Sequence, residues 1–426
     1  MILSLKIKNF LSFKNEMTFS FEATKDRHLE KQHVVEVAPE VRITKLGIVY
    51  GANASGKSNL VKAFEFLHDF WFNSPESKDD ETGTTPFLLD NETKLAPSEF
   101  VLTFYADDKK HVYLLKLNDH VVIEESLCYY PGTQPAEIFS RVLNKNISEI
   151  KFNSKLKINS AAKNEISVKC LTNMSLFAAY NKVNIHLPEM DSVVSWMKDQ
   201  YMDSVEPDNF NLEKFTENLI LKDTTIKDYV LTFLHKADYN ISNFTTKIEK
   251  QAVPDDFINF IMNSSLPVEE KERLKDEKTI QFSETQFLHR VVDQNGHECF
   301  YELSELSQSK GTLRTMGIAG VINRAVTKNA FVAVDEIEAS LHPILVEFVI
   351  ESFLQQSNRA QLLITTHYDG LLEEADLLRN DSIWFTNKLK DGSTEMYSLS
   401  DFKGVNRISS LQKAYKYGKF KAIPNI

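Results

Sequence analysis

The chain has 426 residues, of which 42% are hydrophobic and 26% are charged. At roughly 100 to 200 residues per domain, this length predicts two or three structural units with cores of their own. The composition excludes disordered, collagen-like and low-complexity classes. Cys128, Cys170 and Cys299 lie far apart and in no spacing typical of metal ligands. We therefore expect neither a disulfide framework nor a zinc site, and a cytoplasmic location.

The formal net charge of −11 is unevenly distributed. Residues 187–280 contain 19 acidic and 11 basic side chains, a net charge of −8, whereas residues 141–169 contain seven basic and two acidic ones. Residues 403–426 contain six basic side chains and no acidic one. Because a protein that binds nucleic acid over its whole surface is normally basic, any contact with nucleic acid is expected to be local.

The first residues are typical of a β-strand and not of a targeting segment. Leu3, Leu5 and Ile7 share one face, while Lys6 and Lys8 interrupt any apolar core, and no small-residue cleavage site follows. No run approaches about 18 consecutive apolar residues, so no membrane span is expected.

Residues 44–50 are an apolar run, and apolar side chains recur with helical spacing after the glycine-containing loop that follows. Strand, loop and helix are therefore expected in that order. Residues 99–126 and 137–158 alternate apolar and polar side chains around short turns, which predicts an antiparallel β-layer. Between about 187 and 275 the apolar spacing is helical, which indicates a helical insertion.

Strands return after residue 278. The short runs 331–334 and 362–366 are wholly apolar, as in strands buried on both faces of a parallel sheet, and a helix beginning at Pro343 is expected between them. The sequence thus predicts an α/β fold with a mixed β-sheet core, an antiparallel β-layer and a helical insertion. The expected segments are residues 1–160, with the glycine loop and β-layer, 161–280, mainly helical, and 281–426, which completes the core.

The strongest chemical signal is a phosphate-binding loop at residues 51–58. Its sequence, GANASGKS, fits the pattern GxxxxGK[ST] and lies between the expected strand and helix. Glycine lets the backbone N–H groups face phosphates, Lys57 reaches the outer phosphates, and the Ser58 hydroxyl can bind Mg²⁺. We expect ATP and Mg²⁺ as cofactors, with a chance match in an ordinary loop as the alternative. The residues expected to contact the nucleotide are Gly51, Asn53, Ala54, Ser55, Gly56, Lys57, Ser58 and Asn59.

Two further segments offer the remaining groups for hydrolysis. Asp335 and Glu336 follow a buried strand, so Asp335 is expected to hold Mg²⁺ through water and Glu336 to polarise the attacking water. A solvated acidic turn is the alternative, and Glu338 is expected at the surface. His367 follows the next buried strand and is expected to sense the γ-phosphate, with a surface loop histidine as the alternative.

The order of these motifs resembles the ABC-type ATPase heads of the RecF and SMC group. It is most similar to the compact AAA-labelled ATPases linked to restriction and abortive infection in bacteria. The phosphate loop, a long insertion, the Asp335 and Glu336 strand, the loop at 339–343 and a Thr-Thr-His segment follow one another as in that group. Residues 9–13 (NFLSF) and 417–424 (YGKFKAIP) also match. The resemblance implies an ABC-type P-loop ATPase head.

Such heads carry a signature, normally of the type Leu-Ser-Gly-Gly-Gln before a helix, that binds the γ-phosphate of a nucleotide held by a second subunit. By this resemblance Ser309 and Gly311 are the signature residues, because they keep the required interval before a helical run. The competing register at 306–307 lacks a following glycine, and an ordinary helix cap is the alternative for Ser309. A lobe-connecting glutamine is not evident, since residues 86–87 (PF) stand in its place.

The resemblance implies an ATP-hydrolysing switch that works as a homodimer or higher homo-oligomer and regulates a separately encoded nuclease or toxin in anti-phage defence. No nuclease motif is recognisable, so the effector is expected to be another protein. The alternative is a RecF-type DNA-repair ATPase that binds DNA directly. The glutamate after Asp335 disfavours a small-molecule kinase, and the insertion disfavours a transporter subunit. Partner surfaces are expected on the acidic insertion and on the basic stretches 141–169 and 403–421, with an ordinary solvated helical face as the alternative.

Overall fold

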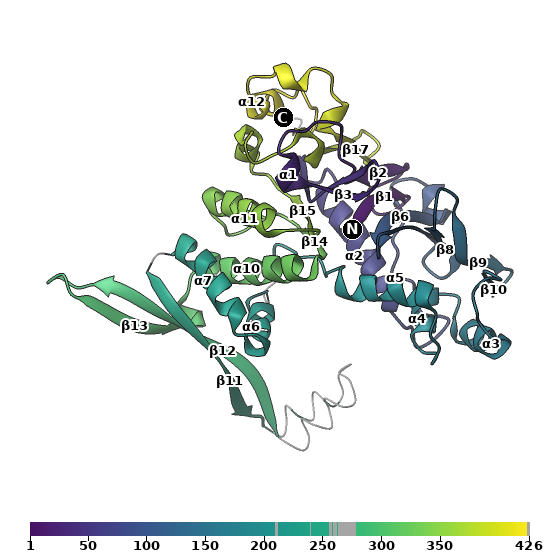
Figure 1. Cartoon of the computed structure of the whole chain (residues 1–426), viewed down its shortest axis with the longest axis horizontal. Coiled ribbons are helices and arrows are strands. Elements are labelled where there is room, and N and C mark those ends of the chain that lie inside the picture. The colour runs from purple at the N-terminus through teal and green to yellow at the C-terminus, as the bar shows by residue number, and fades with distance from the viewer. Residues whose placement is uncertain (209–211, 239, 255–257, 259–261, 263–277, 424–426) are drawn as a thin grey trace. The chain divides into compact units, whose positions relative to one another are not determined.

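The computed structural model describes residues 1–423 apart from 209–211, 239, 255–257, 259–261 and 263–277 (Figure 1). Contacts within the chain form two compact units. The first comprises Met1–Asp208, Arg324–Ala339 and Val346–Ile426, and the second comprises Asn209–Asn323 and Ser340–Leu345. The first unit thus combines segments that lie far apart in the sequence.

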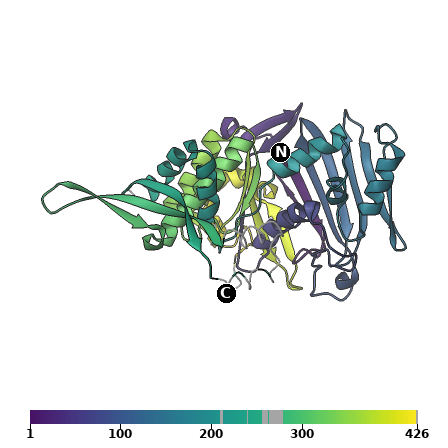
Figure 2. The same ribbon diagram turned by 90° about the horizontal axis from the view of Figure 1, so that it is seen from below.

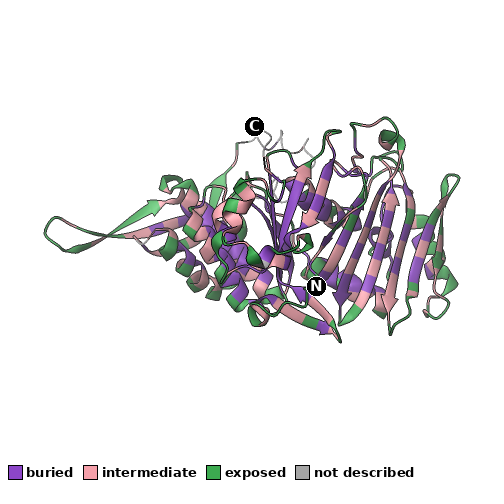
Figure 3. Cartoon of the chain, turned by 90° about the horizontal axis from the view of Figure 1, so that it is seen from above, coloured by how far each residue is buried: buried purple, intermediate pink, exposed green. Residues whose placement is uncertain are grey.

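The core of the first unit is a five-stranded sheet with the order β14-β15-β5-β16-β17. Its strands are β5 (Leu46–Gly51), β14 (Phe331–Val334), β15 (Gln361–Thr365), β16 (Ile383–Lys388) and β17 (Thr394–Ser398). The first four strands of this order run parallel, and β17 is antiparallel to its neighbour. Every residue of β5, β14 and β15 is buried (Figure 3), which confirms the expected strands covered on both faces.

Helices connect the parallel strands, because such strands need crossover connections. α2 (Lys57–Phe72) follows β5, and α10 (Lys310–Lys328) precedes β14. α11 (Pro343–Gln356) lies in the sequence between β14 and β15 and begins at Pro343, where the missing N–H has no helical partner to lose. Among the residues that the structure describes, no helix has both the length and the apolar content that crossing a bilayer requires.

A seven-stranded antiparallel sheet forms a second layer of the first unit (Figure 2), with the order β10-β9-β8-β7-β6-β1-β2. Burial alternates along β7, for example, which confirms the expected antiparallel β-layer. The strands are β1 (Ile2–Lys8), β2 (Met17–Ser20), β6 (Ser98–Ala106), β7 (Lys109–Leu117), β8 (Val122–Tyr130), β9 (Ala136–Asn144) and β10 (Ile147–Phe152). α1 (Glu30–His33) precedes a separate two-stranded sheet, β3 (Val34–Ala38) and β4 (Val41–Thr44).

Trp71, near the end of α2, lies in the aromatic core between the two sheets. Its ring meets the rings of Tyr113, Trp196 and Tyr201 edge-on, at centroid distances of 6.0, 6.4 and 5.1 Å. These distances are typical of favourable aromatic pairs. Three helices supply buried side chains to the same core. They are α3 (Ser160–Lys169), α4 (Leu176–Tyr180) and α5 (Pro188–Asp199).

A buried ion pair connects the antiparallel sheet to the segment before α4. Glu125 of β8 and Arg141 of β9 are both 0% exposed and lie 3.2 Å apart. Glu125 also accepts the Leu176 N–H at 2.9 Å, and Arg141 donates to the carbonyl oxygen of Leu171 at 2.7 Å. These additional bonds stabilise charges whose burial would otherwise be costly. Arg141 is therefore not part of a basic surface, although the sequence places it in a basic stretch.

The described part of the second unit contains two helices besides the first part of α10, and a three-stranded antiparallel sheet with the order β11-β12-β13. The elements are α6 (Leu212–Lys222), α7 (Thr225–Ala237), β11 (Ile241–Ala252), β12 (Thr279–Val292) and β13 (Glu298–Ser304). The expectation of a mainly helical insertion does not hold at β11, which is a strand. Its second half is exposed on both faces, so no apolar alternation marks it as a strand. Residues 263–275, which that expectation also covers, lie outside the described residues.

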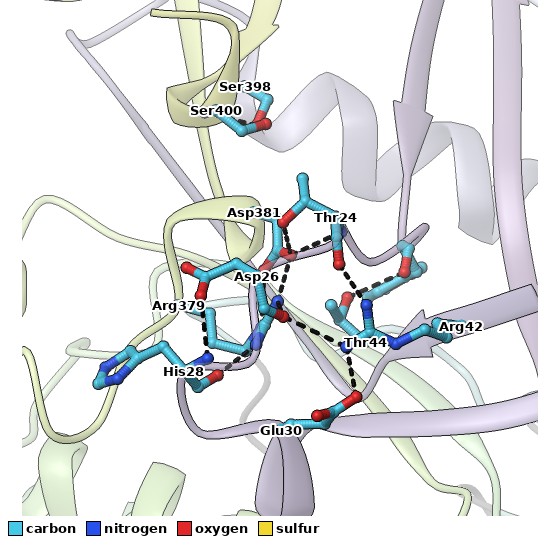
Figure 4. A network of polar contacts seen from close by, with 11 residues as sticks. Thr24, Asp26, His28, Glu30, Arg42, Thr44, Arg379, Asp381, Ser398 and Ser400 are labelled. Carbon is cyan, nitrogen blue, oxygen red and sulfur yellow. Dashed lines mark hydrogen bonds and ion pairs between the residues drawn. The ribbon is translucent and has the colours of Figure 1, made fainter. Parts of the chain in front are cut away.

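A second buried ion pair anchors the loop before α1 to the segment before β16 (Figure 4). Arg379 and Asp381 are 1% and 3% exposed, and Arg379 Nε donates to Asp381 Oδ1 at 2.9 Å. Arg379 also donates to the carbonyl oxygen of Asp26 at 3.1 Å. Asp381 accepts the backbone N–H and the hydroxyl of Thr24, each at 2.8 Å. Because both partners bond to the loop, the pair fixes its conformation.

The buried His33, at the end of α1, makes the stability of the fold depend on pH. Burial, and next the positive charge of Arg379, lower the pKa of His33 from 6.5 to about 4. Between these values the unfolded chain binds a proton that the folded chain does not. The free energy of unfolding should therefore fall as the pH is lowered from 6.5 to about 4. The loss is on the order of 3 kcal/mol, at about 1.36 kcal/mol per pKa unit.

Urea denaturation across this pH range measures the effect. His33→Gln removes the titrating group, so the free energy of unfolding should depend less steeply on pH than in the wild type. His120→Gln, at an exposed turn, is the matched control and should keep the wild-type slope. An unaltered slope in His33→Gln would contradict the role given to His33.

Candidate nucleotide-binding site

The glycine loop 51–58 connects β5 to α2, as the sequence predicts. Ala54 and Gly56 have φ angles of +58° and +106°, so the backbone enters the left-handed region at both positions. Gly51 admits no side chain, because a Cβ there would lie 2.4 Å from the hydroxyl oxygens of both Ser55 and Thr386. Glycine therefore stands where the loop curls and where it packs against β16.

The loop borders a cavity of about 400 Å³ in the first unit. The cavity is lined by Asn53, Ala54, Ser55, Gly56, Lys57, Ser58, Asn59, Glu336 and His367. Loop residues thus share one cavity with residues that follow two neighbouring strands, and its volume is typical of small-molecule sites. Because α2 begins at Lys57, its free N–H groups and positive end face this region, which favours an anionic ligand.

Lys57 is 4% exposed and bonds to groups of the site itself. Its Nζ donates to the carbonyl oxygens of Gly51 at 3.1 Å and Ala52 at 3.3 Å, and lies 3.0 Å from Nε2 of His367. Burial lowers the pKa of Lys57, and the neighbouring carboxylates, Glu336 first, oppose that shift. The ammonium group is therefore held by neutral acceptors, which an anion would replace with stronger, charge-assisted bonds.

Asp335 and Glu336 follow β14, and their side chains have different environments. Asp335 is 7% exposed and accepts a hydrogen bond from the hydroxyl of Thr365, at the end of β15. The same hydroxyl accepts the backbone N–H of Glu336 at 2.8 Å. Glu336 has a φ angle of +46° and lines the cavity. Thr365 thus holds the turn at which one carboxylate stays buried and the other reaches the cavity.

His367 follows β15 and lines the same cavity. Its Nε2 lies 3.0 Å from Nζ of Lys57 and 3.9 Å from Oε1 of Glu336. Burial, and next the charge of Lys57, lower the pKa of His367, so the ring is neutral at pH 7 and Nε2 accepts from the ammonium group. Glu338 is not a free surface residue as expected: it is half-buried, and its Oε1 accepts the His367 backbone N–H.

Three hydroxyl side chains hold the loop, a role that the sequence does not predict for any of them. Oγ of Ser12 accepts from Nδ2 of Asn59 and from the hydroxyl of Thr394, both at 2.7 Å. The hydroxyl oxygen of Thr386 lies 2.7 Å from Oγ of Ser55. These residues come from the turn after β1, from β16 and from β17. Because isolated serine and threonine residues carry no local pattern, only the folded chain reveals their role.

Ser309 and Gly311 belong to the second unit, at the start of α10. Oγ of Ser309 accepts the backbone N–H of Thr312 at 3.0 Å, which is the bond of a helix cap. A Cβ on Gly311 would lie 2.9 Å from the carbonyl oxygen of Ser340, so the close approach of that segment requires glycine. Contact of these residues with a nucleotide in a second copy stays a prediction.

The basic C-terminal segment lies against two strands of the site. α12 (Leu411–Lys416) contacts the turn that follows β15, where Nζ of Lys416 lies 3.2 Å from Oδ2 of Asp369. The ring of Tyr415 lies 5.8 Å from that of Tyr50, near the end of β5. Both strands lead directly into the cavity. α12 thus contacts the segments next to those that carry Lys57 and His367.

A phosphate loop between a parallel strand and a helix, with a carboxylate pair and a histidine at the ends of the neighbouring strands, defines a P-loop ATPase head. The chain belongs to the family described as "AAA domain, putative AbiEii toxin, Type IV TA system", which it matches over residues 48–373. This membership confirms the resemblance that the motifs imply. No curated protein matches the chain.

SMC heads are among the solved structures that match the chain. One is the SMC head domain from Thermotoga maritima, with 12% identity over 93% of this chain and 98% of that chain and a TM-score of 0.41. Another is an SmcHead bound to the C-winged helix domain of ScpA, with 14% identity over 97% of this chain and 99% of that chain and a TM-score of 0.43.

Lys57→Ala should abolish ATP binding and leave the fold intact, because the loop keeps its backbone but loses its buried cation. We expect affinity to fall about 100-fold or more, equivalent to roughly 3 kcal/mol for charge-assisted bonds. Calorimetric titration with ATP measures the change. Lys62→Ala, on the exposed side of the same helix, is the control and should bind normally. Normal affinity in Lys57→Ala, with its thermal unfolding unchanged, would refute the assignment.

Proposed function

We propose that the chain is an ATP-hydrolysing switch whose nucleotide site is the cavity of the phosphate loop. The observation that carries the proposal is that this loop, Glu336 and His367 line one cavity. The backbone N–H groups of the loop and Lys57 would bind the phosphates. The Ser58 hydroxyl and Asp335 provide the oxygen donors that Mg²⁺ prefers, and the metal when bound would neutralise phosphate charge.

Glu336 is the group best placed to activate water. Its carboxylate lines the cavity, whereas that of Asp335 is engaged by Thr365. His367 is neutral and accepts from Lys57. An anion that binds the ammonium group would release Nε2 of His367 to contact the phosphates itself. The positions of Lys57, His367 and Glu336 would therefore depend on whether the terminal phosphate is present.

The proposed switch requires a second copy of the chain. Ser309 and Gly311 lie at the positive end of α10, which has 19 residues, so this end can bind an anion that approaches from outside. A homodimer or higher homo-oligomer in which these residues close the partner's site would make hydrolysis depend on self-association. Each ATPase cycle would then consist of association of two copies around ATP, hydrolysis and dissociation of the copies.

The switch would regulate a separately encoded nuclease or toxin, in anti-phage defence. The family description calls its members putative toxins of a type IV system, which supports a role in such a system and does not itself name a partner. In the described part of the chain, the group of side chains suited to a metal outside the cavity is His68, Asp69 and Asp203. Nδ1 of His68 lies 3.0 Å from Oδ1 of Asp203, so an ion pair accounts for that group. We therefore assign the effector chemistry to a partner.

The C-terminal segment supports coupling between such a partner and the nucleotide. Lys413, Lys419 and Lys421 are exposed, and the segment contacts the turn after β15. An acidic surface, on an effector or on nucleic acid, would be attracted there, and the attraction would weaken as salt rises. Binding at this segment would bias the position of His367.

Glu336→Gln should preserve ATP binding but slow hydrolysis about 10²- to 10³-fold, equivalent to roughly 3 to 4 kcal/mol, because the amide cannot act as a base. It should also accumulate ATP-bound dimers, which light scattering measures. Glu351→Gln, at an exposed position of α11, is the matched control and should turn over normally. Monomers of Glu336→Gln in the presence of ATP, or specific activity independent of protein concentration, would contradict a shared site.

Co-purification with the product of the adjacent gene tests the partner. We expect an association that changes with nucleotide state and that weakens about tenfold in the double variant Lys413→Glu with Lys419→Glu, because two attractive charges are reversed. The double variant Lys94→Glu with Lys109→Glu, exposed elsewhere, controls for net charge. If no neighbouring protein associates in any nucleotide state, and the chain alone protects cells, the proposal of a separate effector is wrong.

A further inference from the structure

β13 is an outer strand of the three-stranded sheet in the second unit (Figure 1). It pairs with β12 along its whole length, from Ser304 opposite Gln286 to Glu298 opposite Val292, and with no other described strand. Proteins usually protect such an edge with charged side chains, above all lysine, or with proline, a bulge or a covering element. β13 contains Glu298 and Glu302 but neither lysine nor proline, and its pairing with β12 has no bulge.

The edge also exposes large apolar side chains on both faces. Phe300, Tyr301 and Leu303 of β13 are 53%, 57% and 40% exposed. On the adjacent strand, Val291 and Val292 are 36% and 66% exposed. Val291, Tyr301 and Leu303 share one face of the paired strands, and Phe300 and Val292 share the other. Single exposed apolar residues are ordinary, but neighbouring ones on both faces of an unpaired edge are of the kind that marks an interaction surface.

Hydrogen bonds of β12 reveal which backbone groups of β13 are free. The Arg290 N–H donates to the carbonyl oxygen of Asn240, and the Leu288 carbonyl oxygen accepts from the hydroxyl of Ser242. Both partners lie on the β11 side of β12. Even-numbered residues of β12 therefore direct their backbone groups to β11, and odd-numbered residues direct theirs to β13.

The register between β12 and β13 then shows which residues of β13 direct their backbone groups away from β12. Phe300 lies opposite Arg290 and Glu302 opposite Leu288, so these pairs are not hydrogen-bonded to one another. Phe300 and Glu302, like Glu298, must direct their N–H and C=O groups away from the sheet. An incoming strand has to place its own outward-facing residues opposite these three.

We infer that β13 pairs with β13 of a second copy of the chain, antiparallel, with Tyr301 opposite Tyr301 of the partner copy. In this register Phe300 lies opposite Glu302, and Glu298 lies opposite Ser304. All seven residues of each strand are paired, the outward-facing backbone groups meet one another, and no two carboxylates stand directly opposite.

The charges on β13 select this register over its neighbours. A shift must be by two residues, since a shift by one would oppose backbone groups that already bond to β12. One such shift places Glu302 opposite Glu302, and the other places Glu298 opposite Glu302. Like charges directly opposite are destabilising, so both shifts are disfavoured. The strand is thus complementary to itself in the register that pairs all seven of its residues, which favours a second copy as the occupant.

This interface is distinct from the proposed function, because it involves neither ATP nor Ser309 and Gly311. It should form without nucleotide and persist in Lys57→Ala. Loss of ATP binding and loss of strand pairing are therefore separable outcomes.

A register-specific crosslink tests the inference with a cysteine that the chain already has. Cys299 would lie opposite Leu303 of the partner copy as a non-hydrogen-bonded pair, whose Cα atoms are about 4.5 Å apart. That spacing suits a disulfide. Leu303→Cys should therefore form a covalent dimer rapidly under mild oxidation without nucleotide. The wild type should not, since its two Cys299 residues would be offset by four positions along the strands.

Three further variants fix the register. Leu303→Cys combined with Cys299→Ser should lose the crosslink, and Tyr301→Cys combined with Cys299→Ser should regain it through the central pair. Phe300→Cys with native Cys299 should remain uncrosslinked, because its side chain lies on the other face. Equal crosslinking of Phe300→Cys and Leu303→Cys, or no covalent dimer of Leu303→Cys at any protein concentration, would overturn the inference.

A measurement of self-association tests the same strand pairing without disulfide formation. Tyr301→Lys places like charges opposite each other at the centre of the pair and should weaken nucleotide-free self-association at least tenfold by sedimentation equilibrium. Lys247→Glu, on the opposite edge of the sheet, is the control and should associate as the wild type does. An unchanged association constant in Tyr301→Lys would overturn the inference, whatever the ATPase activity of either variant.

Discussion

The register of three parallel strands is the constraint on which the nucleotide site depends. β15 lies between β14 and β5, with Ile364 opposite Val334 on one side and Ile48 on the other. The three strands therefore end at one edge of the sheet, and the segments that follow them meet there. A slip of one residue would turn every side chain of a strand to the opposite face. Glu336 and His367 would then no longer lie beside Lys57.

A buried ammonium group makes this edge responsive to an anion. Lys57 loses hydration and gains neutral acceptors in return, and burial lowers its pKa while the nearby carboxylates oppose that shift. His367 bonds to the same ammonium group and is kept neutral by burial and by the charge of Lys57. A phosphate would therefore change the partners of both side chains at once. The turn after His367 would transmit that change to α12.

Local patterns account for the parts of the structure that the sequence predicts. The glycine loop, the wholly apolar β14, the mainly apolar β15 and the alternating β7 each carry their signal within a few residues. Ser12 could not be found in this way, because its partner Thr394 is 382 positions distant. Arg379 and Asp381 are polar residues that normally lie at the surface, and only tertiary hydrogen bonds explain their burial. β11 was missed because half of it has no buried face.

Two modes of self-association would have different consequences for the switch. Closure of a nucleotide site by Ser309 and Gly311 of another copy is a bimolecular step, and at low concentration its rate is limited by encounter. Pairing through β13 needs no nucleotide, so it would keep two heads together through every cycle. Closure would then be governed by an effective concentration, provided that the connection spans the two sites. The presence of the terminal phosphate alone would then decide whether the two heads close. The heads would not dissociate and have to meet again after each hydrolysis.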